Sequence, residues 1–263
     1  MNLVVANDDG IEVPGIWALA RELSKLGQVA VYAPTRNFSG AGMSIRLERE
    51  ARLCRAAPPP GVDPDIPAFT LEAPPASMAA VGTVHAFGGK VDALVSGINP
   101  GWNPGEEPYK VSGTAGAAQV AVERGLLGVA VSAEYFAAAR QFGEIAVATR
   151  RLLGAIRAGF DPLPNVLVNV NVPEDFRKDT PVRLTTPSLN TMFSEFRLKE
   201  CQADEHGVDL SFELGSYFDR EPTPGDEMHA LAEGAVSIAV TGQRPGEVLM
   251  DDPWPDVVRE FRA

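Results

Sequence analysis

Two adjacent carboxylates follow the first apolar segment of this chain. Leu3-Val4-Val5-Ala6 runs directly into Asn7-Asp8-Asp9-Gly10, and helical spacing of apolar residues begins near Gly15. Like charges held close together raise each other's pKa, and a cation bound between them removes the repulsion. Oxygen ligands suit a hard divalent metal. The pair therefore indicates a metal site, and the alternative is a solvated turn that caps the following helix.

Two later loops carry residue types that could complete such a site. Residues 33–42 include Ser39, which offers a hydroxyl oxygen, and Gly40, which permits close backbone approach to a ligand. Residues 96–105 include Asn99, whose carbonyl oxygen suits a hard cation, and Asn103. Gly and Asn are also common in plain turns, so each loop taken alone has that second interpretation.

A third loop, Ser112-Gly113-Thr114, opens a helical segment rich in small residues. Free backbone amides at a helix amino-terminus, together with the Ser and Thr hydroxyls, form an anion site. The alternative is that Ser112 only caps the helix. Because ligands of open α/β sheets bind at the carboxyl ends of the strands, we expect all these loops to approach Asp8 and Asp9.

The segments that must position these loops alternate between strands and helices through the first 170 residues. Val-rich segments predict buried strands, and helical spacing of apolar residues lies between them. The predicted strands are 3–6, 29–33, 93–96, 129–132 and 166–172, and the predicted helices are 15–26, 77–87, 114–124 and 134–158. This alternation predicts an α/β fold, a Rossmann-like three-layer sandwich with a mostly parallel sheet.

Two regions depart from the alternation. Residues 44–55, with 68–71, predict a local antiparallel excursion around a Pro-rich loop at 57–67. Beyond about Pro173 we expect strands and irregular connections over 182–222, a helix at 228–233 and a strand at 236–240. We therefore expect one domain over 1–263, with residues 1–175 as the core and 176–263 as a carboxy-terminal arm plus a returning strand.

Composition argues against several classes of protein. The formal net charge of −12 disfavours polymeric nucleic acid and anionic membranes as partners, but not a small phosphorylated substrate. Two cysteines are too few for a disulfide scaffold, and the three histidines lack metal-binding spacing. No signal peptide or membrane-spanning run is visible, so we expect a cytoplasmic protein.

Taken together, the loops resemble the SurE family of metal-dependent survival-protein nucleotidases. The matching blocks lie in order over most of the chain: Asn7-Asp8-Asp9-Gly10-Ile11, Pro14-Gly15-Ile16, Ala33-Pro34 with Ser39-Gly40, Ser96-Gly97-Ile98-Asn99, Ser112-Gly113-Thr114, Val168-Asn169-Val170-Asn171-Val172-Pro173 and Gly234-Ala235-Val236-Ser237-Ile238. Any single block is a weak signal, whereas the ordered set is specific.

This resemblance implies a set of residue roles. It implies that Asp8, Asp9, Ser39 and Asn99 bind one Mg²⁺ or Mn²⁺ per subunit, and that Asp8, Asp9 and Asn99 are catalytic. It also implies that the substrate is bound by Ser112, Gly113 and Thr114, together with Gly40 and Asn103. The family hydrolyses nucleoside 5′- and 3′-monophosphates, and its members form homodimers or homotetramers that exchange carboxy-terminal elements.

Three departures from the family's pattern bear on substrate preference. Ala73-Pro74-Pro75-Ala76-Ser77-Met78 stands where the family commonly reads Gly-Thr-Pro-Ala-Asp-Cys, Phe38 stands where a polar residue is usual, and Trp102 is bulky. Two other functions stay open. One is a nucleotide- or phosphate-binding module that keeps the metal with negligible turnover. The other is a dinucleotide-dependent oxidoreductase, which the missing Gly-x-Gly-x-x-Gly argues against.

Overall fold

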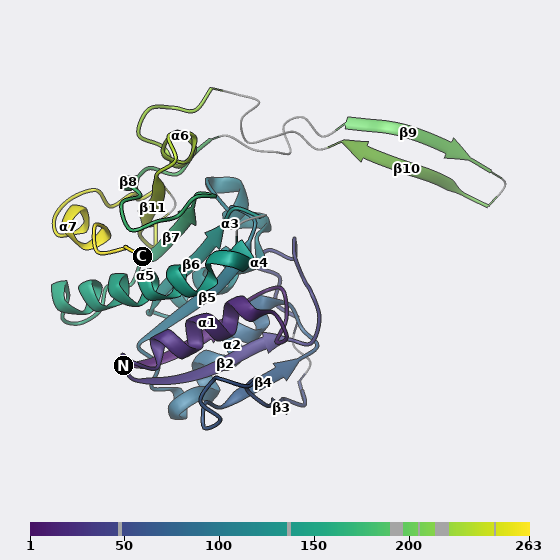
Figure 1. Cartoon of the computed structure of the whole chain (residues 1–263). Coiled ribbons are helices and arrows are strands. Elements are labelled where there is room, and N and C mark those ends of the chain that lie inside the picture. Colours follow the sequence, from purple (N-terminus) through teal and green to yellow (C-terminus); the bar gives the residue numbers. More distant parts are fainter. Residues whose placement is uncertain (47–48, 136–137, 190–196, 205, 214–220, 245) are drawn as a thin grey trace.

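A mostly parallel sheet runs through the middle of the molecule, with helices on both of its faces (Figure 1). The computed structural model describes residues 1–46, 49–135, 138–189, 197–204, 206–213, 221–244 and 246–263. Within these ranges the main sheet has nine strands: β1 (Asn2–Ala6), β2 (Gln28–Pro34), β3 (Cys54–Ala56), β4 (Ala68–Leu71), β5 (Ala93–Pro100), β6 (Leu127–Ala133), β7 (Leu167–Val172), β8 (Val182–Thr185) and β11 (Val236–Thr241). Their order across the sheet is β3-β4-β2-β1-β5-β6-β7-β11-β8.

Two hydrophobic cores hold the helices against the sheet. Side chains of α1 (Pro14–Leu23), α5 (Ala138–Gly159) and α7 (Trp254–Val258) pack on one face, and those of α2 (Pro75–His85) and α4 (Gly113–Glu123) pack on the other. Ile16, Leu19 and Leu23 give α1 one apolar stripe. In contrast, α4 is buried almost all round, because its Gly and Ala residues let it lie close to the sheet. The three-layer α/β sandwich predicted from the sequence is therefore confirmed.

The strand order places a topological switch point beside β1. This strand pairs in parallel with β2 on one side and with β5 on the other. The chain leaves β1 through α1 on one face and reaches β5 through α2 on the opposite face. Ligands of such sheets bind where neighbouring connections diverge in this way, at the carboxyl ends of the strands. Asp8 follows β1, and Asn99 lies at the end of β5, so both are at this point.

The predicted antiparallel excursion is confirmed where 54–55 pair with residues of 68–71, and it is wrong for the other described residues of 44–55. Of the described residues in 44–55, only those of β3 are extended, and β3 pairs antiparallel with β4. However, β4 also pairs in parallel with β2, so it belongs to the main sheet. Alternation over 44–55 was misleading because, among its described residues, Ile45 and Ala51 are exposed and Leu53 is only half-buried, so no buried face holds this segment in a strand.

The carboxy-terminal part both completes the sheet and leaves it. β11 pairs antiparallel with β7, and β8 pairs in parallel with β11, next to α6 (Glu227–Ala232). By contrast, β9 (Arg197–Ala203) and β10 (Val208–Glu213) form a separate antiparallel hairpin that projects away from the sheet (Figure 1). Other residues of the 182–222 prediction, namely 190–196, 205 and 214–220, lie outside the described residues. No helix in the described ranges is both long and apolar enough to cross a membrane.

Candidate active site

The turn that carries the two carboxylates is held by its own first residue. The side-chain nitrogen of Asn7 donates to the Gly10 carbonyl at 2.8 Å, and its oxygen accepts from the Gly10 amide at 3.2 Å. Gly10 has a φ of +111°, which L side chains rarely adopt. Asn7 and Gly10 thus fix the backbone of Asp8 and Asp9 where β1 ends.

Both carboxylates are held in surroundings that disfavour negative charge. Asp8 is 3% exposed, and its burial raises the pKa of its carboxyl, although Thr114 Oγ1 donates to Asp8 Oδ1 at 2.6 Å. Burial, and then the charge of Asp8, raise the pKa of Asp9 to about 7. Among the described residues, the buried Oδ2 of Asp9 has no hydrogen-bond partner. An unpaired buried carboxylate oxygen beside a second carboxylate is an arrangement that a bound cation would stabilise.

The loop that contains Ser39 is bonded directly to this turn. The Phe38 amide donates to the Asp8 carbonyl at 2.7 Å. The Asn37 side chain donates to Asp9 Oδ1 at 3.0 Å and accepts from the Ser39 amide at 2.7 Å, so it joins Asp9 to Ser39. Ser39 and Gly40 are exposed, and a Cβ atom at Gly40 would meet nothing within 4 Å. The loop therefore leaves open space around these two residues.

Asn99 lies at the end of β5, beside β6. Its side-chain nitrogen donates to the Gly101 carbonyl at 2.7 Å within its own loop. In the described part of the chain, no donor bonds to its side-chain oxygen. This leaves the oxygen, which is the atom that a hard cation would use, available to a ligand.

The amino-terminus of α4 packs directly on Asp8. A Cβ atom at Gly113 would lie 2.6 Å from the Asp8 Cβ and 2.8 Å from its Oδ2, so only glycine fits there. Hydrogen bonds from Thr114 and from the Gly113 amide partly oppose the pKa rise of Asp8. Ser112 Oγ accepts from the Ala115 amide at 3.1 Å, so this hydroxyl caps the helix, as the simpler interpretation expected. The structure thus brings Gly113 and Thr114 against the carboxylates.

Asn103, in the same loop as Asn99, belongs to a different hydrogen-bond network. Its side-chain nitrogen donates to Ser132 Oγ at 2.8 Å, and its amide donates to Asn171 Oδ1 at 2.7 Å. Its carbonyl accepts from the Asn169 side chain at 2.8 Å. These contacts tie the loop to β6 and β7, and the described hydrogen bonds of Asn103 do not reach Asp8 or Asp9.

Glu227, which the sequence did not single out, organises this second network. The side chain is fully buried, and its carboxylate accepts from the Gly105 amide, from Asn169 Nδ2 at 2.9 Å and from the Ser188 amide at 3.3 Å. Burial raises the pKa of Glu227 to about 7. No motif marked this glutamate, because its partners come from three segments far apart in the sequence.

The oxygen donors near the switch point fit a divalent cation. The described residues contain no group of three or more His, Cys, Asp or Glu side chains that could hold a metal. A metal here would therefore rely on two carboxylates and on neutral oxygens, such as those of Ser39 and Asn99. The unpaired Oδ2 of Asp9 supports this donor set.

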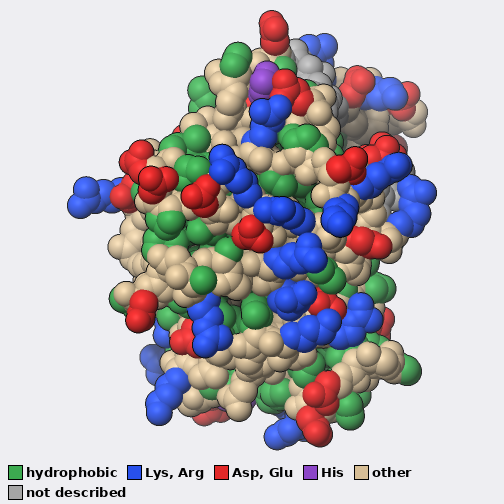
Figure 2. All heavy atoms as spheres, turned by 60° about the vertical axis from the view of Figure 1, so that its left-hand side comes forward, with side chains coloured by type: hydrophobic (Ala, Val, Ile, Leu, Met, Phe, Trp, Pro, Cys, Tyr) green, Lys and Arg blue, Asp and Glu red, His purple; other side chains and the backbone are tan. Residues whose placement is uncertain are grey.

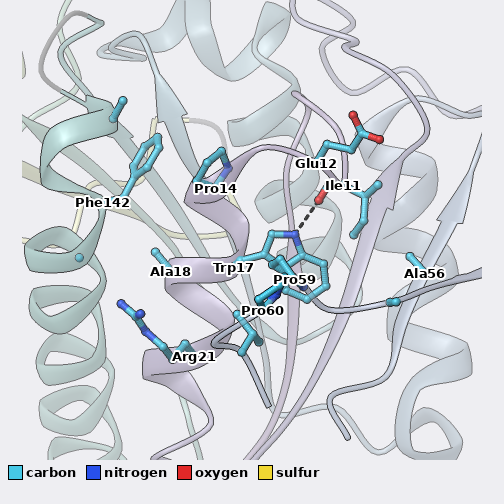
Figure 3. A pocket seen from close by; sticks show the side chains of 14 residues that line it. Ile11, Glu12, Pro14, Trp17, Ala18, Arg21, Ala56, Pro59, Pro60 and Phe142 are labelled. Carbon is cyan, nitrogen blue, oxygen red and sulfur yellow. Dashed lines mark hydrogen bonds between the residues drawn. The ribbon is translucent and has the colours of Figure 1, made fainter. Parts of the chain in front are cut away.

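A cavity of about 720 Å³ lies elsewhere, between α1, α5 and the Pro-rich loop (Figure 3). Apolar side chains dominate it, including Trp17, whose ring nitrogen donates to the Ile11 carbonyl at 2.7 Å, and Phe142. Neither carboxylate of the Asp8-Asp9 pair lines this cavity, and neither Ser39 nor Asn99 does. Its size therefore does not identify it as the chemical centre.

Comparisons with known proteins show which proteins this chain is similar to. The family model described as "Survival protein SurE" matches residues 3–194. The protein named 5′-nucleotidase SurE from one strain of Dehalococcoides mccartyi is 33% identical over 273 residues, which cover 100% of this chain and 98% of that relative. The same-named protein of Sorangium cellulosum is 34% identical over 245 residues, covering 90% of this chain and 87% of that relative.

Other matches are shorter or structural. A second Dehalococcoides mccartyi relative is 34% identical over 175 residues, which span 66% of this chain and 64% of the relative, just under two thirds of its length. The crystal structure of Sure protein from Aquifex aeolicus superposes with a TM-score of 0.72 at 26% identity, covering 93% of this chain and 94% of that one. With the ordered motifs, the model match and the shared fold, this chain belongs to the SurE family.

Proposed function

We propose that this protein is a divalent-metal-dependent phosphomonoesterase that hydrolyses nucleoside 5′- and 3′-monophosphates to nucleoside and phosphate. The observation that carries the proposal is the Asp8-Asp9 pair at the switch point of the sheet, in which Asp8 is buried, Asp9 is half-buried and the Oδ2 atom of Asp9 is unpaired among the described residues. Relatives named 5′-nucleotidase over nearly their whole length support the substrate class. Family membership also argues against the oxidoreductase alternative.

Some residues of the site would bind the metal, and others orient those ligands through hydrogen bonds. Asp8, Asp9, Ser39 and Asn99 would hold one Mg²⁺ or Mn²⁺. A divalent cation bound there would neutralise phosphoryl charge and lower the pKa of a bound water. Thr114 and Asn37 orient the two carboxylates through their hydrogen bonds.

The substrate phosphate would lie at the amino-terminus of α4, near Gly113 and Thr114. The partial positive charge of a helix amino-terminus favours an anion there. Gly40 leaves room for the substrate, and Ser112 and Asn103 would act by fixing the backbone around the site. Hydrolysis forms a bond between phosphorus and a water oxygen and breaks the bond to the ribose oxygen, which leaves as the alcohol with a proton from that water.

The direct test is phosphate release from nucleoside 5′- and 3′-monophosphates, with Mn²⁺ and with a chelator. We expect release that depends on the metal, and its loss in Asp9→Asn, which removes charge from the donor set with little change in shape. In the wild type, Mn²⁺ should also raise the melting temperature by mass action, and Asp9→Asn should weaken that shift. Full metal-stimulated turnover in both Asp8→Asn and Asp9→Asn would refute the assignment.

The same assay separates the alternative of a binding module. Metal-dependent binding of a nucleoside monophosphate without phosphate release would favour that alternative over catalysis. Homo-oligomerisation and a cytoplasmic location, which the sequence analysis expects, stay predictions.

A further inference from the structure

A cavity of about 370 Å³ opens beside the carboxylate turn, between the Ser39 loop and the segment that precedes α2. Phe38, one of its walls, donates its amide hydrogen to the Asp8 carbonyl at 2.7 Å. Pro74, another wall, precedes Pro75, which packs against Gly113 next to Asp8. The cavity therefore adjoins the carboxylates from the side of the Ser39 loop. Its volume lies within the range of small-molecule sites.

The walls of this cavity include the aromatic ring of Phe38 and the cationic guanidinium of Arg36. The Arg36 guanidinium carbon lies 4.3 Å from the centre of the Phe38 ring, and Arg36 Nε lies 3.5 Å from Glu72 Oε1. Leu71, Ala73 and Pro74 supply apolar surface beside that ring. An aromatic ring with apolar neighbours is a surface on which a nucleobase can stack.

Arg46 gives the same cavity a second cation. Its backbone is held by Ser77, a fully buried residue of α2: the Arg46 amide donates to Ser77 Oγ at 2.8 Å, and that hydroxyl donates to the Arg46 carbonyl at 3.3 Å. Among the described residues, no acidic side chain pairs with the Arg46 guanidinium. Two arginines and one glutamate leave the cavity net positive in a chain whose formal net charge is −12.

This cavity also coincides with departures from the family's pattern. Phe38 and the Ala73-Pro74 segment, both singled out in the sequence, line it. Two of the three differences that were expected to alter substrate preference thus lie around one space beside the carboxylates, whereas the third, Trp102, is bonded to the Val172 carbonyl at the end of β7.

We propose that this cavity receives the leaving group of the substrate and selects nucleotides with a second phosphoryl group. The nucleobase would stack on Phe38, and the second phosphate would bind Arg46. The inference rests on the proposed function and names its preferred substrate class, nucleoside bisphosphates over nucleoside monophosphates. Charge-assisted hydrogen bonds from a guanidinium to phosphate are the chemistry that supplies the preference.

The test compares two substrates that differ by one phosphate, adenosine 5′-monophosphate and adenosine 3′,5′-bisphosphate, with Mn²⁺ present. In the wild type, kcat/KM should favour the bisphosphate. In Arg46→Ala the ratio of the two kcat/KM values should fall about tenfold, which corresponds to about 1.4 kcal/mol. Arg49→Ala removes the same charge from a residue that does not line the cavity, and should change the ratio by less than about twofold because a charge outside the cavity is screened by salt.

A second variant tests the nucleobase. Phe38→Leu keeps an apolar side chain but removes the ring, so KM should rise for adenosine 5′-monophosphate and not for ribose 5-phosphate, which has no base. Equal changes for both substrates would show that Phe38 affects the carboxylate turn rather than a base site, and would overturn that part of the proposal.

Failure of this inference can be told apart from failure of the proposed function. A wild type that hydrolyses both nucleotides with equal kcat/KM, or an Arg49→Ala variant that lowers the ratio as much as Arg46→Ala, overturns the inference and leaves the phosphomonoesterase intact. If no nucleotide is hydrolysed, the proposed function fails. Calorimetry with the same two nucleotides then decides: tighter binding of the bisphosphate that Arg46→Ala abolishes supports the cavity, and equal affinities overturn it.

Discussion

Thr114 is the side chain that most directly opposes the cost of burying Asp8. Its hydroxyl donates to Asp8 Oδ1 at 2.6 Å, from the first turn of α4, while Gly113 leaves space for the carboxylate. A hydrogen bond to a charged group stabilises that charge more than a neutral pair would. The orientation of Asp8 toward a ligand thus depends on a helix that begins over one hundred residues later in the chain.

We therefore expect Thr114→Val to lower Mn²⁺ affinity about tenfold or more, because a hydrogen bond to a charged group contributes about 1.5–3 kcal/mol. Thr114→Ser keeps the hydroxyl and is the matched control, with near-normal affinity. Titration calorimetry with Mn²⁺ measures both. Equal affinity in the valine variant and the wild type would show that this hydrogen bond does not orient a metal ligand.

The order of strands and loops in the sequence was enough to predict that the candidate metal ligands lie at one edge of the sheet. It was not enough to predict which residues form hydrogen bonds with them. Asp8, Asp9 and Ser39 follow parallel strands and Asn99 ends one, so the sheet alone brings their loops to one edge. The hydrogen bonds from Asn37 to Asp9 and from Thr114 to Asp8 join residues 28 and 106 positions apart. Such pairs depend on how the loops and α4 pack in three dimensions, and no spacing in the sequence reports that.

At the scale of elements, Glu227 joins α6 to the loop that carries Asn99. Four N–H groups donate to its carboxylate: the Gly105 and Ser188 amides and the side chains of Asn169 and Asn171. A carboxylate has only acceptor positions when ionised, so it matches this set. The neighbouring Asp226 caps α6, and its negative charge adds to burial in opposing ionisation of Glu227.

Glu227 should make stability depend on pH. Its folded-state pKa is about 7, above the ordinary value of 4.5, so the folded protein binds the proton more tightly than the unfolded chain. Its contribution to the free energy of unfolding is therefore full below pH 4.5 and is lost as pH rises through about 7. Glu227→Gln removes this dependence, so the wild type should lose stability relative to the variant between those pH values.

Urea unfolding of both proteins across that interval measures the difference. Glu227→Gln should be the less stable protein at low pH, because an amide nitrogen replaces one acceptor, and Glu227→Leu should be less stable still, since all the donors lose their partner. A constant difference between wild type and Glu227→Gln at every pH would contradict the raised pKa.

The elements of the core could be predicted because their signals are local. β1, β2 and β5 to β7 are buried segments in which apolar residues predominate, and each was found within a few residues of its bounds. The exceptions have non-local causes. β4 reads as part of a hairpin with β3, but it also pairs in parallel with β2, 37 positions earlier in the sequence. Glu227 of α6 accepts hydrogen bonds from residues in segments far apart in the sequence. The hairpin strands β9 and β10 are exposed along their whole length, so they pack on no core that would give them the Val-rich pattern of a buried strand.

At the scale of the whole molecule, charge is spread unevenly. Figure 2 shows Lys and Arg side chains gathered along one face, among Asp and Glu. Glu22, a buried acid of α1, pairs with two cations: Lys25 Nζ, just after α1, lies 2.6 Å from Glu22 Oε1, and Arg150 Nε, in α5, lies 3.2 Å from its Oε2. These ion pairs reduce the positive potential around the helices that carry them. That polymeric nucleic acid is not a partner of this protein stays a prediction.

The β9–β10 hairpin does not pack on either hydrophobic core that the described residues form. Every residue of both strands is exposed, and the hairpin projects from the sheet (Figure 1). Val208 and Leu210 lie on one face, 56% and 50% exposed, opposite Ala203 and Cys201. An isolated two-stranded hairpin is marginally stable in water, and clustered exposed apolar side chains mark interaction surfaces. We expect a second copy of this chain to cover that face.

Leu210→Asp should therefore shift the protein toward smaller species, because it places a charge in the apolar face that the partner would bury. Ser211→Asp adds the same charge to the next residue, which points to the opposite face of the strand, and should leave the assembly unchanged. Sedimentation velocity at micromolar concentration measures both, and circular dichroism checks that the α/β core persists. Since the hairpin contributes none of the residues around Asp8, the Leu210→Asp protein should still bind Mn²⁺. A wild type that sediments as a monomer, or equal dissociation in both variants, would show that the hairpin's apolar face is not a subunit contact.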